Sequence, residues 1–190
     1  MPKLGILISG RGSNMMALHR HIQQGVLNAE IAVVISNKPT AGGLEYAKEN
    51  GINAQVFEPK AFDSSTDYEA AIVAELRANN VDLVVLAGYM KLVGEPILTA
   101  YQSRMVNIHP SLLPSFKGLN AQKQALDYGV TVAGCTVHYV TKDMDAGPII
   151  MQAAVPVLPD DTEASLSERI LVKEHEIFAL AIQDVLNKIS

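Results

Sequence analysis

Short apolar runs alternate with amphipathic stretches over the first 109 residues of the chain. The runs that predict buried strands are 3–9, 30–36, 54–57, 81–87 and 104–109. The stretches with helical spacing between them are 15–24, 41–50, 66–79 and 95–101. Strands that alternate with helices in this way predict right-handed βαβ units. We therefore expect an open, mostly parallel, twisted sheet with helices on both faces, a Rossmann-like α/β fold.

The rhythm changes in the second half of the chain. A helical stretch at 120–128 precedes two strand-like runs, 131–141 and 148–158, with only a loop between them. Such runs are expected to pair antiparallel and to extend the sheet. A long final helix is expected over about 163–188. No repeat or linker interrupts this pattern, which predicts one domain over 1–190.

A glycine turn connects the first strand run to the first helix. Its sequence is Gly10-Arg11-Gly12-Ser13-Asn14, and Ser13 or Asn14 is expected to cap the helix. Strand, glycine turn and helix together direct backbone N–H groups and the positive end of the helix dipole toward an anion. The same spacing also occurs in tight turns that bind nothing, so the residues alone leave both interpretations open.

The helix near residue 66 begins with a capping-box pattern, Thr66-x-x-Glu69. In this pattern the two side chains accept hydrogen bonds from backbone N–H groups at the helix start. Tyr68, Ile72 and Leu76 then share one face, which is expected to pack against the sheet.

Residues 104–118 hold the densest set of candidate catalytic groups. Polar and apolar positions alternate up to His109, which predicts a strand that Pro110 ends because proline has no N–H to donate. Asn107 and His109 would share one face of this strand. An amide can stabilise an oxyanion, and an imidazole can transfer a proton near neutral pH. The two prolines and two leucines that follow predict a stiff loop, which favours a functional interpretation over a plain strand end.

The loop between the two late strands contains a second candidate. Residues 141–148 are small and acidic, which by itself predicts a solvated turn. If this loop folds against His109, Asp145 would orient the imidazole and favour its protonated form. The Gly12 turn, the Met90 segment and His109 each follow a strand, so we expect them at one cleft beside the carboxyl ends of the sheet.

Composition narrows the classes of function. The net charge of −5 and the absence of a basic stripe argue against a nucleic-acid partner. No cluster of Cys or His has zinc spacing, so no metal is expected. The single cysteine, Cys135, excludes an internal disulfide, fits a cytoplasmic location and is expected to serve packing alone. No run resembles a signal peptide or a membrane span, so no membrane partner is expected.

The string Asn107-Ile108-His109-Pro110-Ser111-Leu112-Leu113-Pro114 resembles the signature of the folate-dependent formyltransferases. With the Gly-Ser-Asn turn and Asp145, the similarity covers residues 3–188 and narrows to one branch of that family. Members of that branch formylate the amine of 5′-phosphoribosylglycinamide (GAR) in purine synthesis, with 10-formyltetrahydrofolate as the donor. The resemblance implies direct transfer without a covalent enzyme intermediate, in which Asn107, His109 and Asp145 are catalytic.

The resemblance also implies two binding regions. The residues implied to bind GAR are Gly12, Ser13, Asn14 and Glu174. The residues implied to bind the folate are Met90, Lys91, Leu92, Val93, Asn107, Val140, Thr141 and Asp145. Residues 1–109 would form the nucleotide and phosphate half and residues 110–190 the folate and catalytic-loop half, in a monomer or homodimer with small-molecule partners only. The helical pattern around Glu174 supports a binding role for it, because burying an acid without a partner on an otherwise apolar helix face would cost free energy.

Two positions depart from relatives of this family. Ser65 stands where several relatives carry an arginine near the glutamate tail of the folate, and Gln122 stands where some carry a histidine. The remaining histidines, at positions 19, 21, 138 and 175, are expected to be structural or to lie at the surface. Ser111 has no evident base and is not expected to act as a nucleophile.

Two other functions compete with formyl transfer to GAR. Hydrolysis of 10-formyltetrahydrofolate would use the same catalytic groups with water as the acceptor. A dinucleotide-binding module would use the Gly10-Arg11-Gly12 turn without chemistry. It predicts an acid at the end of the second strand to bind a ribose, and Asn37-Lys38-Pro39 stands there instead.

Overall fold

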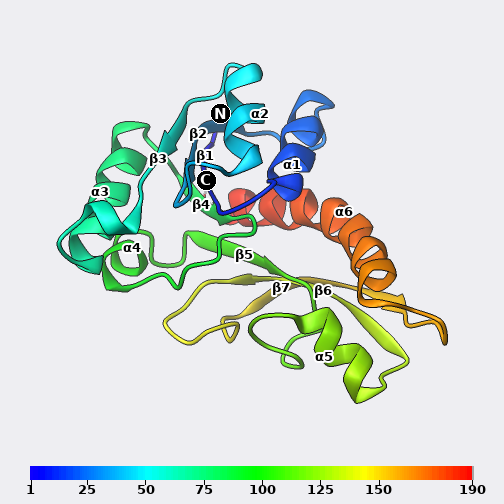
Figure 1. Ribbon diagram of the computed structural model, residues 1–190. Helices are drawn as coiled ribbons and strands as arrows, with labels where there is room; N and C mark the ends of the chain where they lie inside the picture. The colour runs from blue at the N-terminus through cyan, green and yellow to red at the C-terminus, as the bar shows by residue number, and fades with distance from the viewer. Residues whose placement is uncertain (190) are drawn as a thin grey trace.

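The structure is a computed structural model that describes residues 1–189. Seven strands form one sheet in the order β3-β2-β1-β4-β5-β6-β7 (Figure 1). The strands are β1 (Lys3–Ile8), β2 (Glu30–Ser36), β3 (Ala54–Val56), β4 (Leu83–Leu86), β5 (Met105–His109), β6 (Val132–Tyr139) and β7 (Ile149–Pro156). The helices are α1 (Ser13–Gln23), α2 (Gly42–Glu49), α3 (Ser65–Ala78), α4 (Glu95–Ala100), α5 (Ala121–Tyr128) and α6 (Glu163–Ile189), with a 3₁₀ turn at Pro59–Ala61.

The strand directions confirm the predicted α/β architecture. Strands β3, β2, β1, β4 and β5 are parallel, whereas β6 and β7 are antiparallel additions at one edge. Because β1, β4 and β5 are parallel neighbours, their carboxyl ends meet at one edge of the sheet. This is the edge at which open α/β sheets bind ligands.

Helices cover both faces of the parallel part of the sheet. Helices α1, α2 and α6 pack on one face, and α3 and α4 pack on the other (Figure 1). The position of β4 explains why its residues are all apolar. Leu83 and Val85 pack on the α6 side, while Val84 and Leu86 pack on the α3 side. A strand covered on both faces needs apolar residues at every position.

The loop after β5 covers the face of β6 and β7 that is turned away from α6. The hydroxyl of Thr136 donates to the carbonyl of Ser111 (2.7 Å) and accepts from the N–H of Leu113 (3.0 Å). The amide of Gln152 donates to the carbonyl of Leu113 (3.0 Å). Hydrogen bonds from two strands therefore hold the proline-rich loop in place beside His109.

Two capping predictions are wrong. The N-cap of α1 is Gly12, in a left-handed conformation, and no side chain caps the helix, so neither Ser13 nor Asn14 has that role. The N-cap of α3 is Ser64, whose hydroxyl accepts from the N–H of Asp67 (3.1 Å), so the Thr66–Glu69 capping box is absent. Asn14 instead makes a buried contact with Glu174, and α3 starts earlier than its pattern suggests.

Among residues 1–189, no helix is both long and apolar enough to span a bilayer.

Candidate active site

Three of the predicted side chains meet on one face of the sheet, at β5. Asn107 and His109 lie on the same side of β5, opposite Val106 and Ile108, which pack on the α6 side. The carboxylate of Asp145 approaches the ring of His109, with 3.5 Å between Oδ2 and Nδ1. Both side chains are nearly buried, with 7% and 11% of their surface exposed. The structure thus brings together an amide, an imidazole and a carboxylate from distant parts of the chain.

Asp145 reaches this position because its loop folds back over the sheet. Strand β6 is antiparallel to β5, so residues 140–148 start at the amino end of β5 and must run along its face. Asp145 has a φ of 48°, and its Oδ2 accepts from the N–H of Gly118 (2.9 Å). A Cβ on Gly147 would overlap the carbonyl oxygen of Tyr139, so only glycine permits the close approach of the two loop ends.

Both ring nitrogens of His109 face hydrogen-bond acceptors. Nδ1 faces the Asp145 carboxylate, and Nε2 lies 2.9 Å from the carbonyl oxygen of Phe116. The imidazolium form carries an N–H on each nitrogen and satisfies both contacts at once, whereas the neutral ring satisfies one. Each ring nitrogen of His109 thus has an oxygen acceptor within reach.

His138 belongs to this cluster, although the sequence interpretation treated it as structural or exposed. It is buried and pairs with Asn107 across β5 and β6. Its Nδ1 donates to the carbonyl of Tyr139 (2.8 Å), so Nε2 is free to accept from the amide of Asn107 (3.2 Å). Burial lowers the pKa of His138, which keeps the ring neutral and Nε2 an acceptor. The same Nε2 lies 3.8 Å from Oδ1 of Asp145.

The Gly12 turn meets α6 beside the amino end of α1. Gly12 has a φ of +77°, and a Cβ there would lie 3.0 Å from Cα of Gly43, so the turn requires glycine. The amide of Asn14 donates to Oε2 of Glu174 (2.8 Å) in a buried contact between residues 160 positions apart. Burial raises the pKa of Glu174. Oδ1 of Asn14 is buried and has no partner among the described residues, so one polar atom remains available at this turn.

The Met90 segment follows β4 at the same edge of the sheet. The N–H of Met90 donates to the hydroxyl of Ser9 (2.8 Å), which in turn donates to the side-chain oxygen of Asn37 (2.7 Å). Met90 and Leu92 are 61% and 71% exposed. A segment whose backbone is held by hydrogen bonds thus presents exposed apolar side chains after β4, the strand that pairs with β5.

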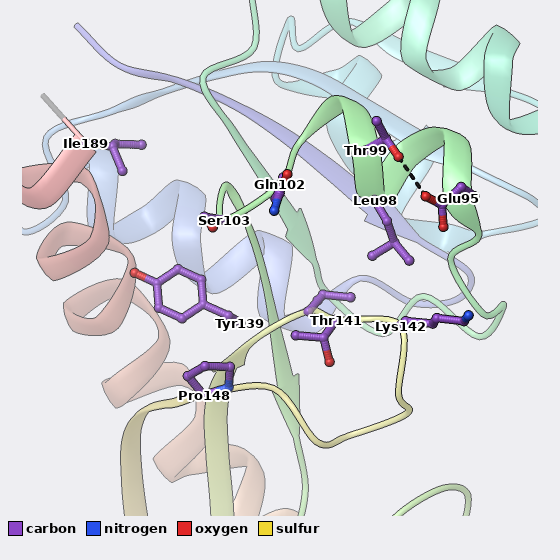
Figure 2. Close-up of a pocket in the computed structure, with 11 residues that line it drawn as sticks. Glu95, Leu98, Thr99, Gln102, Ser103, Tyr139, Thr141, Lys142, Pro148 and Ile189 are labelled. Atoms are coloured by element: carbon purple, nitrogen blue, oxygen red, sulfur yellow. Dashed lines mark hydrogen bonds between the residues drawn. The ribbon is translucent and has the colours of Figure 1, made fainter.

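A cavity of about 650 Å³ lies between α4 and the start of the 140–148 loop (Figure 2). Leu98 points from α4 toward Thr141 across it. Its lining residues are Glu95, Leu98, Thr99, Gln102, Ser103, Tyr139, Val140, Thr141, Lys142, Pro148 and Ile189. It therefore includes the predicted folate residues Val140 and Thr141, but neither residues 90–93 nor the cluster at β5.

Two groups that often serve as nucleophiles are unsuited to that role here. Burial raises the pKa of Cys135 to about 12, so the thiol stays protonated. The hydroxyl of Ser111 donates to the carbonyl of Ser115 (2.6 Å).

Within residues 1–189, no group of three or more His, Cys, Asp or Glu side chains is placed so that it could hold a metal ion.

Comparison with known proteins identifies the family to which this fold and this cluster belong. Residues 2–182 match the formyl transferase family model. The chain therefore belongs to the formyl transferase family. Phosphoribosylglycinamide formyltransferase of Bacillus subtilis is 41% identical over 186 residues, which cover 98% of this chain and 95% of that protein. The human trifunctional purine biosynthetic protein adenosine-3 is 47% identical over 181 residues, but the chain spans only 18% of its length.

Solved structures agree with these relatives. Glycinamide ribonucleotide transformylase 1 of Symbiobacterium toebii matches with a TM-score of 0.95 and 52% identity, covering 96% of this chain and 86% of that one. Phosphoribosylglycinamide formyltransferase of Bacillus halodurans matches with a TM-score of 0.95 and 41% identity, covering 99% and 97%. The relatives that match along their whole length are thus named for formyl transfer to phosphoribosylglycinamide.

Proposed function

We propose that this chain transfers the formyl group of 10-formyltetrahydrofolate to the amine of GAR, in the cytoplasm, giving formyl-GAR and tetrahydrofolate. The observation that carries the proposal is the approach of Asp145 to His109 beside Asn107 on β5, whose parallel neighbours β4 and β1 lead into the Met90 segment and the Gly12 turn. Membership of the formyl transferase family supports the reaction class, and the names of the full-length relatives support GAR as the acceptor.

The Gly12 turn suits the phosphate of GAR. The backbone N–H groups at the start of α1 have no side-chain cap, and the helix dipole favours an anion there. Gly12, Ser13 and Asn14 would bind the phosphate, while Glu174 would accept hydrogen bonds from the ribose. The buried bond between Asn14 and Glu174 supports this assignment, because it holds both residues at one site.

The donor would bind on the other side of the cluster. The exposed apolar side chains of Met90 and Leu92 would pack on the pterin, with Lys91 and Val93 in the same segment. Val140 and Thr141 would close the site from the loop after β6, and Val140 packs against the same buried apolar cluster as Val93. In this arrangement the formyl group reaches Asn107, His109 and Asp145, and residues 1–109 hold the nucleotide while residues 110–190 supply the catalytic loop.

The chemistry follows from these positions. The neutral amine of GAR attacks the formyl carbon and forms the new C–N bond, which gives a tetrahedral intermediate. The bond from that carbon to N10 of the folate breaks when this intermediate collapses. The amide of Asn107 and the protonated ring of His109 stabilise the oxyanion of the tetrahedral intermediate. Asp145 holds His109 in its protonated form, and the proton that the amine loses is passed to N10. Binding both substrates side by side supplies much of the remaining acceleration.

An absorbance assay for tetrahydrofolate tests this proposal against hydrolysis. We expect tetrahydrofolate to form only when GAR is present, in an amount equal to formyl-GAR. Formation at the same rate without GAR would identify the chain as a hydrolase of the donor. No consumption of the donor under either condition would exclude both activities.

The role of His109 is tested by replacing it. His109→Ala is expected to lower kcat at least about a hundredfold, the scale of a lost acid–base group, while tetrahydrofolate still binds. Stopped assays with purified enzyme give kcat, and calorimetric titration gives the affinity for tetrahydrofolate. Near-normal turnover in this variant would remove His109 from the mechanism.

A further inference from the structure

The first two turns of α3 contain a buried carboxylate that the proposed reaction leaves unused. Glu69 is only 3% exposed. One of its oxygens accepts from the backbone N–H of Gly94 (2.7 Å), and the other is buried without a partner among the described residues. Burying a carboxylate is costly unless it is fully hydrogen-bonded. A buried carboxylate of this kind is typical of a residue that fixes the position of another segment rather than of one that only fills space in the core.

What Glu69 holds is the end of the Met90 segment. Gly94 is the N-cap of α4, so its bond to Glu69 fixes the point at which the segment turns into a helix. The fit is close: a Cβ on Gly94 would lie 2.9 Å from both carboxylate oxygens of Glu69. A larger residue at position 94 would therefore displace either the carboxylate or the segment.

The neighbouring residue of α3 holds the other end of the segment. The hydroxyl groups of Tyr68 and Tyr89 lie 2.6 Å apart. The ammonium group of Lys91 lies 5.5 Å from the centre of the Tyr68 ring, within cation–π distance. Consecutive residues of one helix thus contact the segment at its start, middle and end. No residue of 89–94 belongs to a helix or strand, so these contacts define its shape.

We propose that Glu69 is a positioning residue for the formyl donor, acting with the Tyr68–Tyr89 pair to hold residues 89–94 in the shape that binds the pterin. This inference rests on the proposed function, in which that segment forms one wall of the donor site. A loop fixed before binding loses less conformational entropy when the ligand arrives, so the contribution of Glu69 appears in donor affinity. GAR binds at the Gly12 turn and gains nothing from it.

Kinetics of three variants test this role. Glu69→Ala is expected to raise KM for 10-formyltetrahydrofolate at least about tenfold, while KM for GAR and kcat at saturation change less than about twofold. Glu69→Gln keeps an oxygen that can accept from Gly94 and is expected to restore most of the loss. Tyr89→Phe removes one contact only, and we expect KM for the donor to rise about threefold. Calorimetric titration with tetrahydrofolate is expected to follow the same order.

A matched control separates positioning from a general loss of stability. Val73→Ala also truncates a buried residue of α3, but it removes none of the hydrogen bonds or ring contacts by which α3 holds residues 89–94. We expect it to lower Tm without changing KM for the donor. If Val73→Ala and Glu69→Ala raise that KM equally, or if Glu69→Gln does not rescue, Glu69 acts through stability alone. If Glu69→Ala does not fold, an unchanged KM in Tyr89→Phe overturns the proposal.

The wild-type chain in the same assay keeps the two hypotheses apart. Absence of GAR-dependent tetrahydrofolate formation contradicts the proposed function. Normal wild-type turnover together with an unchanged donor KM in the Glu69 and Tyr89 variants contradicts only the positioning role. If the chain proves to be a hydrolase of the donor, the same variants are still expected to raise KM for 10-formyltetrahydrofolate.

Discussion

Asp145 lies between two histidines that make different hydrogen bonds. Both nitrogens of His109 face oxygen acceptors. His138 instead donates through Nδ1 and accepts through Nε2, which requires the neutral ring. The Asp145 carboxylate lies near both rings and could pair with either one. The amide N–H of Asn107 can donate only to an unprotonated Nε2, so this hydrogen bond requires a neutral His138 ring.

His138 is therefore expected to orient Asn107 rather than to transfer a proton. His138→Ala would let the amide of Asn107 rotate, and we expect kcat to fall about tenfold with both KM values unchanged. His138→Gln retains an acceptor and is expected to recover part of the loss. Steady-state kinetics of the two variants measure this. A fall as deep as that of His109→Ala, unrelieved by glutamine, would instead assign His138 a direct part in the chemistry.

Burial of His138 also predicts a pH dependence of folding. Its pKa is lowered in the folded chain, so on acidification the unfolded chain takes up a proton first, near 6.5. Between that pH and the lowered pKa the unfolded state binds more protons, and stability falls as the pH falls. Thermal unfolding from pH 8 to pH 5 is expected to show a smaller loss in His138→Gln than in the wild type. Equal losses would mean that this ring does not contribute.

Glu174 is expected to weaken the fold while serving the site. Burial raises its pKa, so its charged form is unfavourable in the folded chain at neutral pH. Glu174→Gln keeps an acceptor for Asn14 and is expected to raise Tm by about 2–4 °C, the effect of roughly 1 kcal/mol in a chain of this size. The gain is expected to shrink as the pH falls through the raised pKa, because the wild-type carboxyl then also becomes neutral.

The same substitution tests the ribose assignment. If Glu174 binds GAR, Glu174→Gln is expected to raise KM for GAR about tenfold and to leave KM for the donor unchanged. Greater stability with weaker binding is the trade-off expected of a residue retained for function. A higher Tm with unchanged kinetics would show that the carboxylate has no part in the site.

The sequence predicted which side chains share a face of one strand, but it did not predict the contacts between strands. Strand alternation is enough to place Asn107 and His109 on one face. The role of His138 depends on the register of β6 against β5, which pairs it with Asn107 and which periodicity does not specify. The approach of Asp145 depends on a loop that folds back along a strand, so the residues predicted it only on the condition of that fold, and the family resemblance supported it. The partner of Glu174 is 160 residues away and lay beyond any local pattern.

At the scale of elements, α3 shows where local patterns mislead. Both Ser64 and Thr66 can precede a helix, and three residues after each stands an acid, Asp67 or Glu69. The structure uses the first pair: Ser64 accepts from the N–H of Asp67 and donates to its carboxylate (2.7 Å). Glu69 faces inward to Gly94 instead. Tertiary contact, which the local sequence does not contain, decides between two equivalent caps.

This choice predicts unequal effects at the start of α3. Ser64→Ala removes a real N-cap and is expected to cost about 1 kcal/mol of stability, a fall in Tm of about 2–4 °C. Thr66→Ala, two residues further along the exposed first turn, is the matched control and is expected to change Tm by less than about 1 °C. Differential scanning calorimetry at pH 7 compares the two. A larger fall in Tm for Thr66→Ala than for Ser64→Ala would show that Thr66 is the N-cap of α3.

The most regular elements were the easiest to predict. Runs covered on both faces, such as β2 and β4, and the long amphipathic α6 appear where the pattern placed them, with boundaries shifted by at most a few residues. The 3₁₀ turn at Pro59–Ala61 was not predicted, because a single turn has too few residues to show a period. Helix starts were less reliable, since a cap depends on one side chain and its neighbours.

At the scale of the whole molecule, both proposed binding regions join segments that are distant in sequence. The GAR region joins α1 to α6 through Asn14 and Glu174. The donor region joins the segment after β4 to the loop after β6. The parallel order of β1, β4 and β5 makes this possible, because all three strands end at the same edge of the sheet. Ligands that bridge such segments are expected to stabilise the fold as a whole, not only the loops they touch.

Ligand-dependent unfolding tests that expectation. GAR at about one hundred times its Kd is expected to raise stability by about 2.7 kcal/mol, which corresponds to roughly 5–10 °C in Tm. Tetrahydrofolate at a matched excess is expected to do the same. Asn14→Ala is expected to remove most of the shift caused by GAR and to leave that caused by tetrahydrofolate, because Asn14 lies at the Gly12 turn and not beside residues 90–93. If both shifts are lost together, Asn14 supports the fold rather than one site, and the assignment of the two regions to two ligands is wrong.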